Sequence, residues 1–371
     1  MKTIFRDGHI PVLLFFALCL LLVSSGCTKM ADTRVSDQTV SNAQTAEEDT
    51  FRLAGFTQVN LVANRAGYHP LHVDQELHNA WGLSASPGGT FWVSAADGGV
   101  SFVYNSLGVQ PIPAVKIPSH TKGVRGNPTG QVFNGTPDFI IAKNGKPAVF
   151  LFASEDGTIS GWNGGSNAIV VGDRSEKGAG YTGLAMANND GANFLYAANF
   201  AQHKIDVFDK DFQFVQGSGF KDPDIPKMYA PFNVRNINNM LYVTYAVVAS
   251  DGEDSTGAGL GYVDVFWPNG TFSKRIATKG SLNAPWGITP ASEKLLKTSA
   301  LLIGNFGDGH INVYDWDGNF KGQLKSGGQP VAIEGLWAID NTVANTSERQ
   351  LYFTAGPADE EDGLFGFLSK F

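Results

Sequence analysis

The stretch Asp315-Trp-Asp-Gly-Asn319 has the residue types of a calcium-binding loop, with two aspartates separated by one residue and a glycine beside them. An EF-hand loop also needs glycine at its sixth position and a bidentate glutamate at its twelfth. Counted from Asp315, this chain places Phe320 and Ser326 there. The sequence therefore predicts a turn between two strands at this stretch.

Carboxylates elsewhere support a second metal hypothesis. Glu334, together with Asp308 and Asp97, could surround a calcium ion, which takes six to eight oxygen ligands. A weaker hypothesis uses three neighbouring histidines, because imidazole suits zinc or copper: His69, His72 and His78. These histidines match no strict metal-binding spacing, so a surface loop with hydrogen-bonded histidines is the alternative.

Asparagines and aromatic residues form a third candidate site. Amides pair with hydroxyl or peptide groups while rings supply apolar faces, which suits a sugar or peptide ligand. The alternative is that the tryptophans pack between elements of the fold and the asparagines satisfy turn backbone. The predicted ligand-binding residues are Asn79, Trp81, Asn127, Asn199, Tyr245, Asn283, Trp286, Asn305, Asp308 and Glu334.

The elements that must position these residues are indicated by a repeat. An inner-strand pattern recurs six times, 48 to 54 residues apart, starting at Trp81, Thr129, Thr182, Phe232, Trp286 and Glu334. Each copy is followed by two more runs rich in aromatic and β-branched residues, separated by glycine-containing turns. This period predicts an all-β, six-bladed β-propeller with four-stranded blades. A β-helix would show a shorter period, and two stacked sandwiches would not repeat six times.

The ends of the repeat predict how the ring closes. The last copy stops after its third strand at Phe371, while a spare strand, Thr57–Ala63, precedes the first copy. We expect this N-terminal strand to complete the last blade, so that no long strand edge is left open.

Propeller topology predicts which face carries the candidate residues. The inner strand of a blade starts at the face to which the turn between the second and third strands returns. The predicted ligand and metal residues lie in these segments, so we expect them at that mouth of the central channel. The Asp315–Asn319 turn leaves a third strand and is expected at the opposite face.

The N-terminus has the pattern of a targeting segment. Lys2 and Arg6 precede an apolar run from Ile10 to Val23, and small residues then lead to Cys27. We predict a lipoprotein signal peptide at 1–26, a lipidated Cys27 with a disordered tether at 27–50, and the propeller at 51–371. The protein would then be exported and held on a bilayer of the cell envelope, facing the periplasm or the outside. An ordinary secretory signal with an incidental cysteine is the alternative.

The composition of the chain limits the classes of partner that we expect it to bind. The 371 residues are 43% hydrophobic and carry a formal net charge of −8, and the cysteines are Cys19 and Cys27. An acidic exported domain is an improbable nucleic-acid binder. We expect a monomer that folds without disulfides.

Several short motifs carry a family resemblance. Gln58-Val-Asn-Leu-Val, Asn79-Ala-Trp-Gly-Leu, Ala284-Pro-Trp-Gly-Ile and Gly304-Asn-Phe-Gly-Asp-Gly together resemble an uncharacterised family of exported bacterial propellers similar to NHL-repeat proteins. The resemblance implies the fold and export but no activity. Gluconolactonase-like and regucalcin-like propellers hold a channel metal with a glutamate on the first inner strand, where this chain has Trp81-Gly82.

Two functional hypotheses follow. The first is a lipid-anchored binding or scaffold module that holds a peptide, glycan or partner protein at the channel mouth. The second is a calcium-dependent hydrolase or lactonase-like enzyme with the ion in the channel. The sequence contains no Gly-x-Ser-x-Gly, His-Glu-x-x-His or phosphate-binding glycine loop, which favours the first.

Overall fold

The computed structural model describes residues 51–217 and 219–370. The predicted signal peptide, Cys27 and the tether lie outside the described residues. Within the described part, no helix is both long and apolar enough to cross a membrane.

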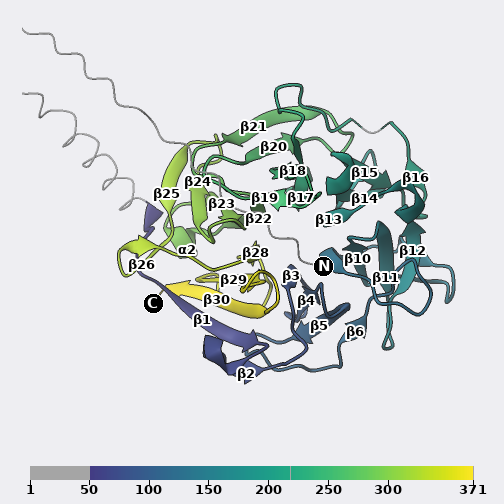
Figure 1. Cartoon of the computed structure of the whole chain (residues 1–371), viewed down its shortest axis with the longest axis horizontal. Helices are drawn as coiled ribbons and strands as arrows, with labels where there is room; N and C mark the ends of the chain where they lie inside the picture. The colour runs from purple at the N-terminus through teal and green to yellow at the C-terminus, as the bar shows by residue number, and fades with distance from the viewer. Residues whose placement is uncertain (1–50, 218, 371) are drawn as a thin grey trace, which may run out of the picture. The chain divides into compact units, whose positions relative to one another are not determined.

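Six antiparallel sheets surround a central channel (Figure 1). The inner strands are β3 (Ala80–Ala85), β7 (Pro128–Phe133), β13 (Tyr181–Asn189), β17 (Tyr229–Ile237), β22 (Pro285–Ala291) and β28 (Leu336–Asp340). The second strands are β4 (Phe91–Ala95), β10 (Phe150–Ser154), β14 (Ala192–Asn199), β18 (Met240–Val248), β23 (Ala300–Asn305) and β29 (Gln350–Ala355). The third strands are β5 (Val100–Tyr104), β11 (Thr158–Trp162), β15 (Lys204–Phe208), β20 (Tyr262–Phe266), β24 (Ile311–Tyr314) and β30 (Leu364–Lys370). The outer strands are β6 (Val115–Lys116), β12 (Ile169–Asp173), β16 (Phe214–Val215), β21 (Phe272–Thr278), β25 (Phe320–Gln323) and β1 (Phe56–Ala63).

Short elements decorate these blades. The additional strands are β2 (His72–Val73), β8 (Ile140–Ile141), β9 (Lys146–Pro147), β19 (Asp254–Ser255), β26 (Lys325–Ser326) and β27 (Gln329–Pro330). The helical turns are η1 (Ala66–Tyr68), η2 (Ser175–Lys177), η3 (Phe200–Gln202) and α2 (Glu293–Leu296). The predicted six-bladed propeller is therefore confirmed.

The ring closes through the first described strand, as predicted. β1 pairs antiparallel with β30, in a register that joins Phe56 to Lys370 and Ala63 to Leu364. In Figure 1 the purple β1 lies beside the yellow β30, although they are at opposite ends of the described chain. β2 then adds to β1 in parallel, so the last sheet has five strands.

The Asp315–Asn319 stretch is the predicted turn between the third and outer strands of its blade. One carboxylate oxygen of Asp315 accepts hydrogen bonds from the backbone N–H groups of Asp317 at 3.0 Å and Asn319 at 2.8 Å. Gly318 has φ 93°, a conformation that glycine adopts without steric cost. The carboxylate thus serves the turn itself.

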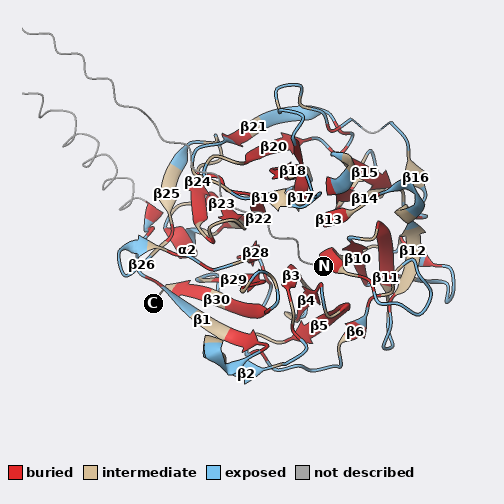
Figure 2. Ribbon diagram, viewed as in Figure 1, coloured by how far each residue is buried: buried red, intermediate tan, exposed pale blue. Residues whose placement is uncertain are grey.

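The core lies in and between the blades. Figure 2 shows the inner, second and third strands largely buried and the outer strands more exposed. Large rings pack from one blade to the next: Trp92 of β4 stacks on Phe150 of β10 with ring centroids 4.1 Å apart. This packing makes the blades mutually dependent and gives the channel rigid walls.

The register of the inner strands corrects the predicted start of the sixth copy of the repeat. The residues before Trp81 and Trp286 pair with the last residue of the second strand in their blades, and Leu336 does the same in the sixth. Trp337 is therefore the equivalent of Trp81 and Trp286. The prediction that Glu334 begins an inner strand is wrong, because Glu334 lies in the loop two residues before β28.

A glycine follows the equivalent position in four blades for a steric reason: Gly82, Gly130, Gly183 and Gly287. A Cβ atom at Gly82 would lie 2.1 Å from the carbonyl oxygen of Thr129 on the next inner strand. At Gly287 it would lie 2.6 Å from the carbonyl oxygen of Trp337. The recurring glycine lets neighbouring inner strands approach closely around the channel.

Candidate functional site

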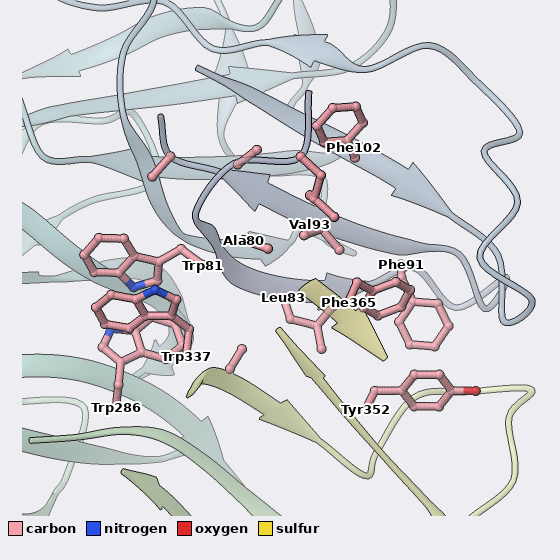
Figure 3. Packing of buried hydrophobic residues seen from close by; sticks show 14 of the residues in the cluster. Ala80, Trp81, Leu83, Phe91, Val93, Phe102, Trp286, Trp337, Tyr352 and Phe365 are labelled. Carbon is pink, nitrogen blue, oxygen red and sulfur yellow. The ribbon is translucent and has the colours of Figure 1, made fainter. Parts of the chain in front are cut away.

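One end of the channel is filled by aromatic rings. Trp81, Trp286 and Trp337 occupy equivalent places on three inner strands, and each is at most 4% exposed. Trp81 stacks on Trp337 with centroids 3.7 Å apart and planes 13° apart, and Trp286 meets both edge-on (Figure 3). Phe232 and Phe306 pack on Trp337 as well. We call these five residues the aromatic plug.

Hydrogen bonds fix the plug in place. The indole N–H of Trp286 donates to the carbonyl of Thr182 at 3.0 Å. The indole N–H of Trp337 donates to the Asn79 side chain at 2.8 Å, and Asn79 donates in turn to Glu360 at 2.6 Å. The amide of Asn79 is thus used within the protein.

The other predicted asparagines are used in a similar way. Asn199 caps η3 by accepting the backbone N–H of Gln202 at 3.2 Å, and it is fully buried. Asn283 accepts the N–H of Gly257 at 2.6 Å. Asn305 is buried and donates to the carbonyl of Ser281 at 2.8 Å. These contacts match the alternative in which asparagines satisfy turn backbone.

Two further predicted ligand-binding residues, Tyr245 and Asn127, lie apart from the plug. Tyr245 is 5% exposed and packs in the hydrophobic cluster between the third and fourth blades. Asn127 is half-buried just before β7, and its backbone carbonyl accepts the N–H of Glu155 at 3.1 Å.

The predicted calcium ligands are engaged in different contacts. Exposed Glu334 accepts the backbone N–H of Ala358 at 3.0 Å. Asp308 accepts hydrogen bonds from the amides of Asn305 at 3.0 Å and Asn283 at 3.2 Å. Asp97 is exposed in the turn after β4. Across residues 51–217 and 219–370, no group of three or more His, Cys, Asp or Glu side chains is placed to hold a metal ion.

The three histidines likewise point to different partners. A ring nitrogen of His72 lies 3.1 Å from the carbonyl oxygen of Leu107, and one of His78 lies 2.7 Å from that of Glu361. His69 is exposed and ends η1 in the left-handed conformation, with φ 50°.

Carboxylates nevertheless influence one another at the plugged end. Desolvation by the surrounding loops raises the pKa of Asp254 to about 7 and that of Glu155 to about 8, although Glu155 retains contact with solvent. The charges of Glu360 and Glu253 add to both shifts. Burial also raises the pKa of Glu360, against the hydrogen bond from Asn79. We call these four residues the acidic rim.

The other end of the channel holds a cavity of about 440 Å³. Its walls are the later residues of the inner strands and the turns that follow β3 and β28, and Trp286 also belongs to its lining. The walls present polar and apolar surface in similar amounts, and the apolar part includes Leu83, Val132, Phe133, Leu184, Met186 and Ile288. Its size is that of small-molecule sites. The cavity lies opposite the mouth at which the sequence places the candidate residues.

An ion pair spans this cavity. An Nη atom of Arg235 on β17 lies 2.8 Å from a carboxylate oxygen of Asp340 on β28, so the pair bridges two blades that are not adjacent. The other oxygen of Asp340 accepts the N–H of Thr342 at 2.7 Å and its hydroxyl at 2.6 Å. Burial alone would raise the pKa of Asp340, but Arg235 and Thr342 together hold it below its ordinary value.

Most other polar side chains of the cavity are already bonded within the protein. Asn233 donates to the carbonyl of Trp286 at 2.9 Å, and Asn236 to that of Met186 at 2.7 Å. Gln131 donates to the carbonyl of Gly82 at 2.9 Å. The hydroxyl of Ser84 is buried and has no hydrogen-bond partner among the described residues.

Sequence reasoning missed Arg235 and Asp340, although the repeat contains their signal. We call the place of Trp81 in its blade the plug position; it is occupied by Phe232 in the fourth blade and Trp337 in the sixth. Arg235 and Asp340 both stand three residues after it, where the other blades have Ser84, Val132, Ala185 and Thr289. A charged residue on an inner strand faces desolvation and needs a partner. Aligning the sixth copy on Glu334 concealed the fact that two charges share this position.

Comparisons with known proteins find relatives over most of the chain. An uncharacterised protein of Acanthamoeba polyphaga mimivirus is 34% identical over 328 residues, which cover 84% of this chain and 79% of that protein. A second uncharacterised mimivirus protein is 32% identical over 332 residues, covering 84% and 86%. No family model matches the chain.

Solved structures share the architecture at low sequence identity. A streptogramin B lyase superposes with a TM-score of 0.52 at 11% identity, covering 86% of this chain and 99% of that one. The GH93 α-L-arabinofuranosidase of Fusarium graminearum gives a TM-score of 0.54 at 10% identity, covering 85% and 97%. At this identity, the similarity establishes the propeller fold alone.

Proposed function

We propose a function from the site itself, because the chain belongs to the same family as the two uncharacterised mimivirus proteins and family membership brings no activity with it. The proposed function is that of a binding module that takes a small ligand, or the end of a larger one, in the channel cavity. The observation that carries the proposal is the cavity of about 440 Å³, with apolar and polar residues in its walls and one ion pair whose carboxylate is buried. Polar groups at fixed places beside apolar surface favour binding of a ligand in one orientation.

Binding is favoured over catalysis by the state of the polar groups. Arginine stays protonated and cannot accept a proton. Asp340 has a lowered pKa and accepts three hydrogen bonds, from Arg235 and from the two donors of Thr342. A carboxylate so well satisfied is a poor general base.

The place of binding differs from the mouth expected from the sequence. At that mouth the aromatic plug fills the channel, and most of the predicted asparagines bond to the protein's own backbone or carboxylates. A peptide, glycan or protein terminus could enter the cavity from the opposite face.

The test is to fill the cavity. Ala185 on β13 lines the cavity and is buried, so Ala185→Phe would occupy part of its volume. Binding of a panel of small apolar acids, alcohols and amines to the purified full chain is measured by ligand-observed NMR. The matched control is Ala332→Phe, at an exposed loop position outside the cavity. Wild type and control bind members of the panel, and Ala185→Phe loses them; equal binding by all three proteins would overturn the proposal.

Anchoring forms a second part of the proposal. The motivation is the basic and apolar N-terminal segment that ends at Cys27. A lipid on Cys27 and the tether of residues 28–50 would hold the binding module on a membrane. Replacing Cys27 by serine is expected to release the protein from the membrane fraction and to remove incorporation of labelled fatty acid. Unchanged membrane association would exclude the anchor.

A further inference from the structure

We infer that the ligand of the cavity is a small amphipathic anion, with an apolar body and a carboxylate-type group that binds Arg235. This inference rests on the proposed function, because it names the ligand class of the same cavity. It follows from a count of which hydrogen-bonding groups remain available there.

The donors of Arg235 are largely unused. A guanidinium carries five N–H donors in a planar fork. One of its Nη atoms donates to Asp340, and no other side-chain hydrogen bond of Arg235 exists within residues 51–217 and 219–370. The side chain keeps 27% of its surface exposed and belongs to the cavity lining. The remaining donors are therefore accessible from the cavity.

The acceptors of the cavity are, in contrast, already satisfied. Asp340 receives three hydrogen bonds and is 7% exposed. The side-chain oxygen of Asn236 accepts the backbone N–H of Asn239 at 2.8 Å, and that of Gln131 accepts the hydroxyl of Ser101 at 3.0 Å. A cationic ligand would find little to bind and would have to displace Arg235 from Asp340.

An acceptor group on the ligand matches this asymmetry. A carboxylate can take two parallel hydrogen bonds from the free side of the guanidinium, and such charge-assisted pairs are stronger than neutral ones.

The ion pair pre-organises the site. Asp340 on the sixth blade holds the guanidinium of Arg235, which comes from the fourth blade. The planar set of donors on Arg235 therefore does not have to be ordered when a ligand binds. The other charged side chains of the described chain lie outside the cavity lining, so the head group has one place to bind. The apolar body would occupy the space beside Leu184, Met186 and Ile288.

The experiment compares three probes with one apolar body and different heads: octanoate, 1-octanol and octylamine. Their affinities for the full chain are measured by isothermal titration calorimetry at neutral pH. Octanoate is expected to bind at least about tenfold more tightly than 1-octanol, the size of one charge-assisted hydrogen bond. Octylamine is expected to bind most weakly.

Variants assign the preference to Arg235. Arg235→Lys keeps the charge but loses the planar guanidinium. It is expected to lower the affinity for octanoate about tenfold and to leave the affinity for 1-octanol unchanged. The double variant Arg235→Met with Asp340→Leu replaces the pair by apolar groups without leaving a buried charge. It should bind 1-octanol at least as well as wild type and lose the preference for octanoate. The control Arg349→Met removes an exposed arginine from the turn before β29 and should change neither affinity.

The outcomes separate this inference from the proposed function. If the three probes bind equally, and Ala185→Phe abolishes their binding, the cavity is a ligand site but the anion preference is wrong. If octanoate binds and Arg235→Lys leaves its affinity unchanged, the assignment to Arg235 is wrong. If Ala185→Phe binds the probes as wild type does, the proposed function fails first.

Discussion

The two ends of the central channel are formed by the same six inner strands and yet differ in almost every physical property. At the end where these strands begin, the aromatic plug fills the space, and carboxylates with raised pKa values surround it. At the end where they finish, smaller side chains leave a cavity of about 440 Å³ that is crossed by one ion pair.

The difference arises from side-chain size at two positions of one repeat. Three residues separate the plug position from the position of Arg235 and Asp340, where the other blades have Ser84, Val132, Ala185 and Thr289. Four aromatic residues at the plug position, together with Phe306, close the channel, and the mostly smaller residues at the second position do not. A propeller can therefore place its site at either end without changing its backbone.

The largest effect is expected from opening the plugged end. Trp337→Ala should cost about 3 to 5 kcal/mol in the free energy of unfolding, because Trp337 is fully buried and contacts all other members of the plug. Urea unfolding followed by circular dichroism measures this. Trp267→Ala, at a position that is 52% exposed, is the matched control and should change the stability little. Equal losses in the two variants would contradict a structural plug.

At the cavity end, breaking the ion pair should be the next largest effect. Arg235→Met alone leaves Asp340 buried without its charge partner and is expected to cost about 3 kcal/mol. The double variant with Asp340→Leu should recover most of this loss, because replacing a buried pair by apolar groups is close to neutral. Thermal and urea unfolding of both variants provide the test. A double variant as unstable as Arg235→Met would show that the pair itself stabilises the fold.

The acidic rim predicts a dependence of stability on pH. The folded chain keeps protons on Asp254 and Glu155 up to about pH 7 and 8, whereas the unfolded chain releases them near their ordinary values of 3.8 and 4.5. The free energy of unfolding should therefore fall as the pH rises from 5 to 8, by about 2 kcal/mol once solvent screening is allowed for. Asp264, whose pKa burial raises to about 7, contributes in the same direction.

One substitution isolates the contribution of the rim. Asp254→Asn removes a carboxylate whose Oδ2 atom is buried without a partner among the described residues, so the slope of stability against pH should become shallower. Asp317→Asn, in an exposed turn at the cavity end, is the control and should keep the slope of wild type. Thermal unfolding at half-unit pH intervals measures this slope in each protein. An unaltered slope in Asp254→Asn would contradict the mutual influence of the carboxylates in the acidic rim.

The smallest effect is expected from the turn that resembles a calcium loop. Asp315→Ala removes the acceptor for two backbone N–H groups and should cost about 0.5 to 1 kcal/mol. Added calcium should leave the melting temperature of wild type unchanged, because one oxygen of the Asp315 carboxylate already accepts hydrogen bonds from both backbone N–H groups. A calcium-dependent rise that disappears in Asp315→Ala would restore the metal hypothesis for the cavity end.

Much of the fold was predictable because the repeat is visible in residue types. The six copies, the closing strand at Thr57–Ala63 and the Asp315–Asn319 turn depend on local patterns, and the structure confirms each of them. The sixth copy was misplaced by three residues, since Glu334-Gly335 imitates the Trp-Gly pair of other blades. The strand register against β29 places Trp337 there instead.

The candidate site was less predictable, because residue type does not reveal which hydrogen bonds are already made. Asn199 and Asn305 have the right type and face for a ligand, but both are buried and bonded to their own blades. Arg235 lies in a strand that sequence reasoning treated as scaffold. Its partner stands 105 positions away, a separation that no local pattern connects.

By itself, the sequence determined the number of blades, their closure and the turns, because these follow from the strand period and from glycine and aspartate at tight turns. Only the tertiary structure decided which end of the channel is open. That outcome depends on how residues from six separate strands fill one shared space, and on a charge of the fourth blade meeting a charge of the sixth across the fifth.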